Sequence, residues 1–518
     1  MEASRTAKSI RNAKVGMLLQ AAAILTSFVT RTAFVRVLGI SFNGLNGLFN
    51  EVIAMMSLAE LGVGTAIVYN LYRPLAERDV EAVKRLMGLF KRAYRIIAAA
   101  IVVIGLALTP FIQFIVKGTE FTTDYIRVVF LLFVLQTASS YLFAYKRSLL
   151  NADQQNYVVS LVMLAASVIM TGVNVAVLVL SRNYILYLVV QIIGSAGANL
   201  VISWAADRRY PYIRRNRARA LPEEKRDVMK NIRHIFVGDV SGRITSSTDN
   251  ILISVLVSTY QIGIYSNYAM IMNAVMTLFR KGTEAIAGGI GNLMVTETPR
   301  RVDAVFRRAE FLLSTIGFVV AVILYSVLTP FIQFWIGTDY IISAPTLYIS
   351  VFNVFLFIAR EPLWKTVVAA GLFSRDKNIS IIGSTANLIV SIFLGKLWGM
   401  AGIFLGTTIS LVLQIILKTV LLYRERLDAS PRTSLLAWLG MGALTIICMA
   451  AAGLLCGMIR TPLLILDIAA RGLAAAALGA GCIWVLFRKT EEFSYCMGLA
   501  KQIIWKKEVG SDGKAKGK

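Results

Sequence analysis

The residues most able to bind a polar ligand are charged and amide side chains that recur within long apolar segments. In the first such segment, Gln20, Ser27 and Arg31 stand at spacings of 7 and 4 residues and therefore share one helix face. A centrally placed arginine costs about 2.5 to 3.5 kcal/mol to insert into a bilayer, so it usually faces a bundle interior or an aqueous cavity. No carboxylate lies at helical spacing from Arg31 in its own segment, although Glu60 or another segment could pair with it. We therefore predict that Arg31 faces a cavity.

Two further polar stripes lie in later apolar segments. Asn50 and Glu60 follow one face of the second segment, and Asp239, Arg243 and Asn250 follow one face of the seventh. Asp239 and Arg243 could form an i, i+4 ion pair that only makes this stripe tolerable inside a bundle. The alternative is that they line a cavity together with the stripe of the first segment.

Arg360 differs from these residues in its surroundings. Glu361 is adjacent to it and points in another direction, and Pro362 interrupts the helical hydrogen-bond ladder there. Arg360 could therefore line a cavity or lie at a membrane interface. The candidate residues of a substrate cavity are Arg31, Asn50, Glu60, Asp239, Arg243, Asn250 and Arg360.

Ion coupling would need a membrane carboxylate, because histidine chemistry is almost absent from the chain. His234 is the only histidine, which excludes a multi-histidine metal site. The four cysteines lie in or near the last two apolar segments without metal-ligand spacing. We expect no metal, no cofactor and no catalytic residue. The candidate ion-coupling residues are Glu60, Asp239 and Glu284.

The segments that carry these residues predict an all-α integral membrane protein. The chain has 518 residues, of which 57% are hydrophobic and only 16% are charged, more apolar surface than a soluble chain could bury. From Val15 onward, apolar runs of roughly 18 to 28 residues follow one another, each long enough to cross a hydrocarbon core of about 30 Å. We predict about fourteen transmembrane helices, with no connection long enough to hold a soluble domain.

The basic residues carry topological information. The net charge is +25, and the Lys and Arg residues lie mainly in short connections between apolar runs, most densely from Arg208 to Arg233. By the positive-inside rule, both termini and the basic connections are expected in the cytoplasm. Attraction to membrane lipids, and not to nucleic acid, is the expected use of this basic surface.

An internal repeat divides the chain. The heptapeptide LTPFIQF at Leu108–Phe114 recurs 220 residues later at Leu328–Phe334, and Val80–Arg85 is matched by Val302–Arg307 at an offset of 222. Each repeat would hold six spans, an even number, so both would cross the membrane in the same orientation and could rock about a central cavity. We expect a six-helix bundle at 1–206, a basic cytoplasmic linker at 207–233, a second six-helix bundle at 234–424, two additional helices at 425–488 and a basic cytoplasmic tail at 489–518.

Three stretches resemble a known family. The segment SLAELGVGTA at Ser57–Ala66, the following YNLYRPLA at Tyr69–Ala76 and the preceding GLNGLFNEVI at Gly44–Ile53 are similar to the second span and first cytoplasmic connection of Wzx-type oligosaccharide flippases. These polysaccharide exporters belong to the multidrug/oligolipid/polysaccharide (MOP) superfamily. The likeness in motifs is concentrated in residues 31 to 85, whereas the likeness in architecture covers the chain. It implies a MATE-like MOP fold of two parallel six-helix repeats plus two C-terminal helices.

The resemblance also implies a function. A Wzx-type flippase moves an oligosaccharide linked through pyrophosphate to a polyprenol across the bacterial inner membrane, by alternating access, for synthesis of O-antigen, capsule or exopolysaccharide. Arg31 and Arg243 are the positions available here to meet the sugar or pyrophosphate, and a polysaccharide polymerase and a chain-length regulator are possible partners. The alternatives are a MATE-like drug or cation antiporter, and a polytopic polysaccharide polymerase or glycosyltransferase. The polymerase would need a sizeable periplasmic loop and the transferase a cytoplasmic catalytic domain, and neither is visible. The sequence does not indicate the glycan, the driving force or the oligomeric state.

Overall fold

The structure is a computed structural model that describes the backbone of residues 5–60, 63–214, 216, 218–427, 429–459 and 463–498. The side chains of residues 5–19, 58–59, 65, 230–231, 233–247, 281–282, 284–292 and 295 lie outside this description. The chain forms two compact units, Met1–Ser266 and Asn267–Lys518, named unit 1 and unit 2 below. The boundary falls inside one long helix, later in the chain than the predicted linker, because the helix that follows this linker packs within unit 1.

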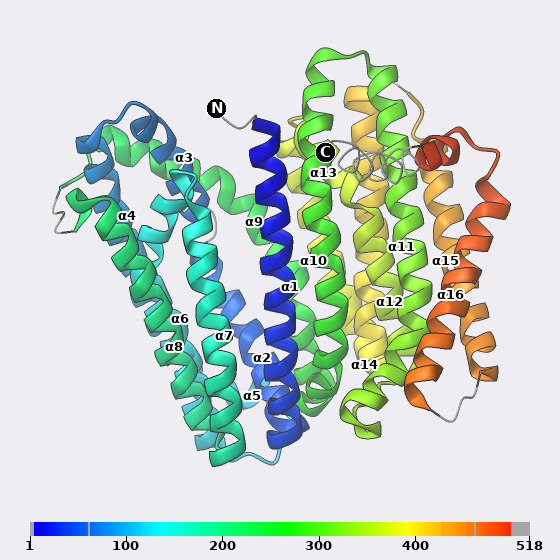
Figure 1. The fold of residues 1–518 in the computed structure, drawn as a ribbon, viewed down its shortest axis with the longest axis horizontal. Helices are drawn as coiled ribbons and strands as arrows, with labels where there is room; N and C mark the ends of the chain where they lie inside the picture. The colour runs from blue at the N-terminus through cyan, green and yellow to red at the C-terminus, as the bar shows by residue number, and fades with distance from the viewer. Residues whose placement is uncertain are drawn as a thin grey trace, which may run out of the picture. The chain divides into compact units, whose positions relative to one another are not determined.

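Unit 1 consists of long helices joined by short turns (Figure 1). Its elements are α1 (Arg5–Leu38), α2 (Ile40–Met56), η1 (Ser57–Glu60), α3 (Val63–Ala76), α4 (Val80–Leu108), η2 (Thr109–Phe111), α5 (Ile112–Ile115), α6 (Thr123–Ala152), α7 (Asn156–Ser181), α8 (Tyr184–Arg209), η3 (Pro211–Ile213), α9 (Pro222–Leu256) and the first part of α10 (Thr259–Thr296).

Unit 2 is built in the same way. Its elements after α10 are α11 (Pro299–Ile336), η4 (Thr338–Tyr340), α12 (Ala344–Ala359), α13 (Glu361–Ala369), α14 (Phe373–Leu422), η5 (Tyr423–Leu427), α15 (Arg432–Met458) and α16 (Leu464–Phe487). The helix α11 packs against α12, α15 and α16, and α14 packs against α12 and α13.

The described helices confirm an all-α membrane protein of about the predicted number of spans. Eleven helical segments of the described chain are long and apolar enough to cross a membrane. One of them, Phe373–Leu427, is 55 residues long and kinks at Gly399, so it holds two of the expected crossings. The expected second and seventh spans lie on α2 and α3 and on α9, which carry the polar stripes.

Unit 1 is organised around α6, which packs against α4 on one side and α8 on the other. Fully buried aromatic side chains fill this region, among them Tyr94 from α4 and Phe130 from α6. Other faces of the helices remain apolar but exposed, with Leu180 at 85% and Ile96 at 69% of their maximal accessibility. Such faces suit contact with lipid, since backbone polar groups are satisfied within the helices themselves.

Two glycines bring α2 and the start of α10 into backbone contact. A Cβ atom at Gly44 would overlap the carbonyl oxygen of Thr259, and one at Gly263 would overlap that of Ile40. Only residues without a side chain allow helices to approach this closely, as in the small-residue interfaces of membrane helices. This contact fixes the position of the α2 residues described below.

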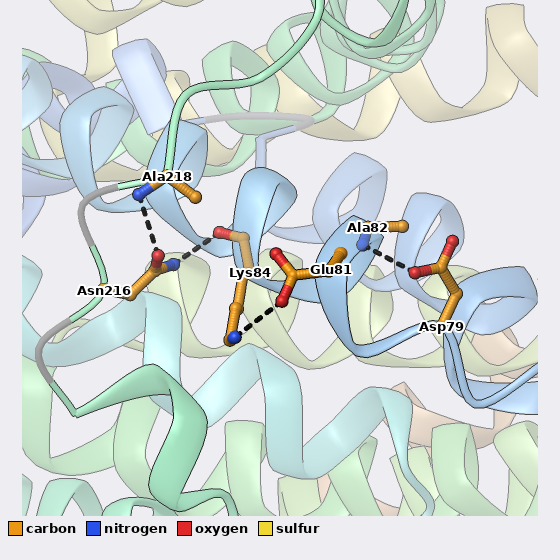
Figure 2. Close-up of polar contacts among 6 residues, drawn as sticks. All are labelled: Asp79, Glu81, Ala82, Lys84, Asn216 and Ala218. Atoms are coloured by element: carbon orange, nitrogen blue, oxygen red, sulfur yellow. Dashed lines mark hydrogen bonds and ion pairs between the residues drawn. The ribbon is translucent and has the colours of Figure 1, made fainter.

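The first part of the basic connection 207–233 docks onto α4 (Figure 2). The side chain of Asn216 donates through Nδ2 to the carbonyl oxygen of Lys84, and its Oδ1 accepts from the backbone N–H of Ala218 at 2.9 Å. A Cβ atom at Gly88 would overlap the carbonyl oxygen of Ala218. This part of the connection therefore lies against the helix surface.

The start of α4 is fixed by its own cap and by an ion pair. Asp79 accepts the backbone N–H of Ala82 at 2.9 Å through Oδ1, which satisfies one free donor of the first turn (Figure 2). Arg85 donates through Nε to Oε1 of Glu224 at 3.0 Å, and this bond joins α4 to the start of α9.

The repeated heptapeptide adopts different structures in the two units. In Leu108–Phe114, α4 ends and a 3-10 turn carries Pro110, whereas in Leu328–Phe334 the helix α11 continues through Pro330 to Ile336. The same seven residues therefore tolerate either a break or a continuous helix. Their surroundings decide between the two.

Candidate functional site

Arg31 in α1 is bound to α2 through a side-chain amide. Its Nη1 donates to Oδ1 of Asn43, whose side chain is fully buried. Asn43 in turn donates through Nδ2 to the carbonyl oxygen of Gly263 at 2.6 Å and to Oγ of Ser266 at 2.8 Å. Arg31 is therefore connected to the place where α1, α2 and the start of α10 meet.

Aromatic rings border this arginine. Tyr184 and Tyr187 of α8 lie close enough to Arg31 to interact with its charge. The ring of Phe34 lies 5.6 Å from that of Tyr184 and 5.2 Å from that of Tyr187, and Phe42 lies 5.2 Å from Tyr184, all measured between centroids. Such rings exclude water and strengthen the electrostatic interactions of the guanidinium.

One residue of the predicted seventh-span stripe, Asn250, contacts α2 within unit 1. Nδ2 of Asn250 in α9 lies 3.5 Å from Oε1 of Glu51 in α2, at the limit of a hydrogen bond. Asn50 is exposed and donates through Nδ2 to the carbonyl oxygen of Asn46 at 2.6 Å. Asn250 thus contacts α2 through the carboxylate of Glu51, which is not among the predicted cavity residues.

Glu60 ends the 3-10 turn between α2 and α3 and faces two tyrosines. The hydroxyl groups of Tyr94 in α4 and Tyr141 in α6 lie next to its carboxylate, and their rings stack with centroids 6.2 Å apart. Among the described residues, no ion pair includes Glu60. Its carboxylate is therefore surrounded by neutral donors.

Arg360 in unit 2 lies between two aromatic rings at the junction of α12 and α13. Its guanidinium carbon is 4.3 Å from the centroid of Phe357 and 4.6 Å from that of Trp364. Its Nε is buried and makes no hydrogen bond with the rest of the described chain. Pro362 stands in the first turn of α13, as the sequence indicated, and places the arginine at the C-terminal end of α12.

Two further cations lie near Arg360, and each has its own carboxylate. Lys418 of α14 pairs with Asp376, and its Nζ lies 4.5 Å from the centroid of Trp364. Arg280 lies 4.0 Å from Glu361, measured from Nε to Oε1. Glu361, Arg280 and Lys418 all interact electrostatically with Arg360. This group of residues, named the Arg360 cluster below, holds three cations and two carboxylates, and no ion pair within 4.0 Å includes Arg360 among the described residues.

Three of the candidate residues lie outside the described side chains. They are Asp239, Arg243 and Glu284, so their place in a cavity and in ion coupling stays a prediction. Arg31, Asn50, Glu60 and Asn250 all lie in unit 1, and Arg360 lies in unit 2.

Asn43 and Lys418 are not among the site residues predicted from the sequence. No local sequence pattern indicated the hydrogen bonds of Asn43, because its partners Gly263 and Ser266 are far away in the chain. The aromatic partners of Arg360 could have been found from helical spacing, since Phe357 stands three residues before it and Trp364 four residues after it.

Comparisons with known proteins bear on the fold. No family model matches the chain, and no curated protein matches it. Among solved structures, the chain is similar to the lipid II flippase MurJ in an inward closed conformation, with a TM-score of 0.69 and 15% identity over 90% of this chain and 99% of that one. The chain has the fold of MOP superfamily transporters. This confirms the predicted fold, and at this identity the likeness extends to the fold alone.

Multidrug transporters have the same architecture. An inward-facing MATE family transporter of the MOP superfamily gives a TM-score of 0.61 at 13% identity and covers 83% of this chain and 96% of its own. The MATE multidrug transporter DinF-BH gives a TM-score of 0.55 at 17% identity over 80% of this chain and 97% of its own. These structures and MurJ share the fold of this chain.

Proposed function

We propose that the protein is a flippase that moves a polyprenyl-pyrophosphate-linked oligosaccharide across the bacterial inner membrane for surface polysaccharide synthesis. The observation that carries this proposal is Arg360. Its guanidinium lies between two aromatic rings, its Nε has no hydrogen-bond partner within the described chain, and the neighbouring carboxylates are paired with other cations.

An unpaired and mostly buried cation favours an anionic ligand. Burying a charge without a partner is expensive, so such a group is retained where a ligand supplies the opposite charge. The planar fork of arginine matches phosphate oxygens, and a pyrophosphate offers several of them. A cationic drug would be repelled by the same group. The Arg360 cluster therefore supports a pyrophosphate-linked substrate over the cargo of a drug antiporter.

Transport in this proposal needs no covalent chemistry. The substrate would stabilise one conformation of the two repeats relative to another, by no more than its difference in binding free energy between them. Arg31 and Arg243 in a central cavity, both termini in the cytoplasm, and delivery of the glycan to a polymerase and a chain-length regulator belong to the same proposal.

Export in cells tests the proposal. In a host whose own copy is deleted, Arg360→Ala should abolish surface glycan at a normal level of protein in the membrane, and Arg360→Lys should retain part of it. The matched control is Arg375→Ala, since Arg375 is an exposed arginine of unit 2 that pairs with Glu425. Normal export by well-expressed Arg360→Ala, together with efflux of cationic dyes by the wild-type protein, would instead identify an antiporter.

A further inference from the structure

A cavity of about 300 Å³ lies at one end of unit 2, where α15 and α16 pack on α11. It is lined by the first turns of α15, by one face of α11 and by residues that follow α16. Its size is at the lower end of the range for pockets that hold small ligands. The cavity contains none of the residues of the Arg360 cluster.

A buried carboxylate forms the inner wall of this cavity. Glu310 is only 6% exposed, and it accepts hydrogen bonds from Oγ of Ser434 at 2.9 Å and from Nε1 of Trp438 at 2.6 Å. Both donors are neutral. The nearest arginine on its helix, Arg307, instead lies 3.7 Å from Asp303, measured from Nε to Oδ2. Because a carboxylate has about four acceptor positions, Glu310 can accept further bonds from a cationic ligand.

The rim of the cavity carries charges of both signs. Arg307 and Glu492 line it and are partly exposed, so a ligand can reach a cation and two carboxylates at once. On the outside, Leu436 and Leu439 of α15 are each 67% exposed, and Leu486 of α16 is 57% exposed. A mostly apolar cavity that carries charged groups at its inner wall and rim thus opens beside an apolar helix face.

The cavity lies at the ends of two candidate membrane spans. It lies where α15 begins at Arg432 and α16 ends at Phe487. At this level a phospholipid places its head group, while its acyl chains run along the neighbouring apolar faces.

We propose that this cavity binds the head group of a zwitterionic aminophospholipid such as phosphatidylethanolamine. The ammonium group would donate to Glu310 and Glu492, the phosphate would bind Arg307, and the acyl chains would lie along α15 and α16. A choline head group has no N–H donor for the carboxylates, and an anionic head group would meet two carboxylates with no cation of its own. The site is separate from the proposed transport substrate and would hold a resident lipid.

Lipid binding to the purified, delipidated full chain tests this proposal. Native mass spectrometry would compare phosphatidylethanolamine, phosphatidylcholine and phosphatidylglycerol with identical acyl chains. Phosphatidylethanolamine should bind about tenfold more tightly than the other two, which is the value of one charge-assisted hydrogen bond.

Variants of the charged residues that line the cavity identify which of them bind the lipid head group. Glu492→Gln and Glu310→Gln should each remove the preference for phosphatidylethanolamine. Arg307→Gln should weaken the binding of both phosphatidylethanolamine and phosphatidylglycerol. Glu491→Gln and Arg300→Gln change the same charges at exposed positions outside the cavity and should leave binding unchanged.

Two results would overturn the proposal. One is equal binding of the three lipids by the wild-type protein. The other is a preference for phosphatidylethanolamine that survives Glu492→Gln, a rim position whose replacement leaves the buried network of Glu310 intact. Tighter binding of phosphatidylglycerol would show an anionic lipid site and would equally contradict the assignment.

Discussion

Two partly buried arginines of this protein are held in different ways. Arg31 in unit 1 donates to Asn43, which bonds to Gly263 and Ser266, so its charge belongs to a network that joins three helices. Arg360 in unit 2 is held by the faces of Phe357 and Trp364, and its Nε has no hydrogen-bond partner in the described chain. Arg31 is thus held by a hydrogen-bond network, whereas Arg360 is held mainly by aromatic faces.

Disrupting the helix contact beneath Arg31 should have the largest effect. In Gly44→Val the side chain would overlap the backbone of Thr259, so we expect a loss of about 3 kcal/mol or non-productive insertion. Thermal unfolding in detergent and protein level in the membrane measure this. The control Gly442→Val changes a glycine with open space around it and should be tolerated. A Gly44→Val protein as stable as the control would show that this contact does not hold unit 1 together.

Removing each arginine in turn tests the comparison itself. Arg31→Ala leaves the buried Asn43 without one of its partners and should lower stability by about 1 to 3 kcal/mol. Arg360→Ala removes a charge that forms no ion pair within 4.0 Å in the described chain, and it should leave stability unchanged or raise it. Denaturation curves of both variants decide the matter, and the opposite order of stabilities would reverse the assigned roles.

A double-mutant cycle sharpens the assignment of Arg31. Arg31→Ala and Asn43→Ala should be non-additive by about 1 kcal/mol, because each removes the same hydrogen bond. Arg31→Ala combined with Arg360→Ala should be additive within about 0.5 kcal/mol, since the two residues share no partner. An additive Arg31 and Asn43 pair would mean that their bond contributes little.

The smallest effect on stability is expected at Glu60. Glu60→Gln keeps the shape of the side chain and an acceptor for Tyr94 and Tyr141, so stability should change by less than about 0.5 kcal/mol. If Glu60 couples transport to an ion, the variant should lose the dependence of transport on pH or sodium. A fully retained dependence would exclude Glu60 as a single coupling site.

The fold was predictable because the thickness of the bilayer determines the length of apolar runs. The break at Pro362 was predictable because proline lacks the backbone N–H of the helical hydrogen-bond ladder. Helical phase indicated that Asn250 lies on a polar face of its helix, but it did not indicate the partner Glu51. The network of Asn43 was not predictable, since Gly263 is 220 residues away and no local pattern links the two. Helical phase describes the faces of a helix but does not identify the helix opposite.

The most direct test of the central claim is the binding of a polyprenyl pyrophosphate to the purified protein. We expect Arg360→Ala to weaken the binding of this lipid about tenfold to a hundredfold, as expected for lost charge-assisted hydrogen bonds. Inorganic pyrophosphate should compete with the lipid for the wild-type protein. Arg375→Ala, at an exposed arginine paired with Glu425, should bind like the wild-type protein. Unchanged binding by a folded Arg360→Ala variant would contradict the account.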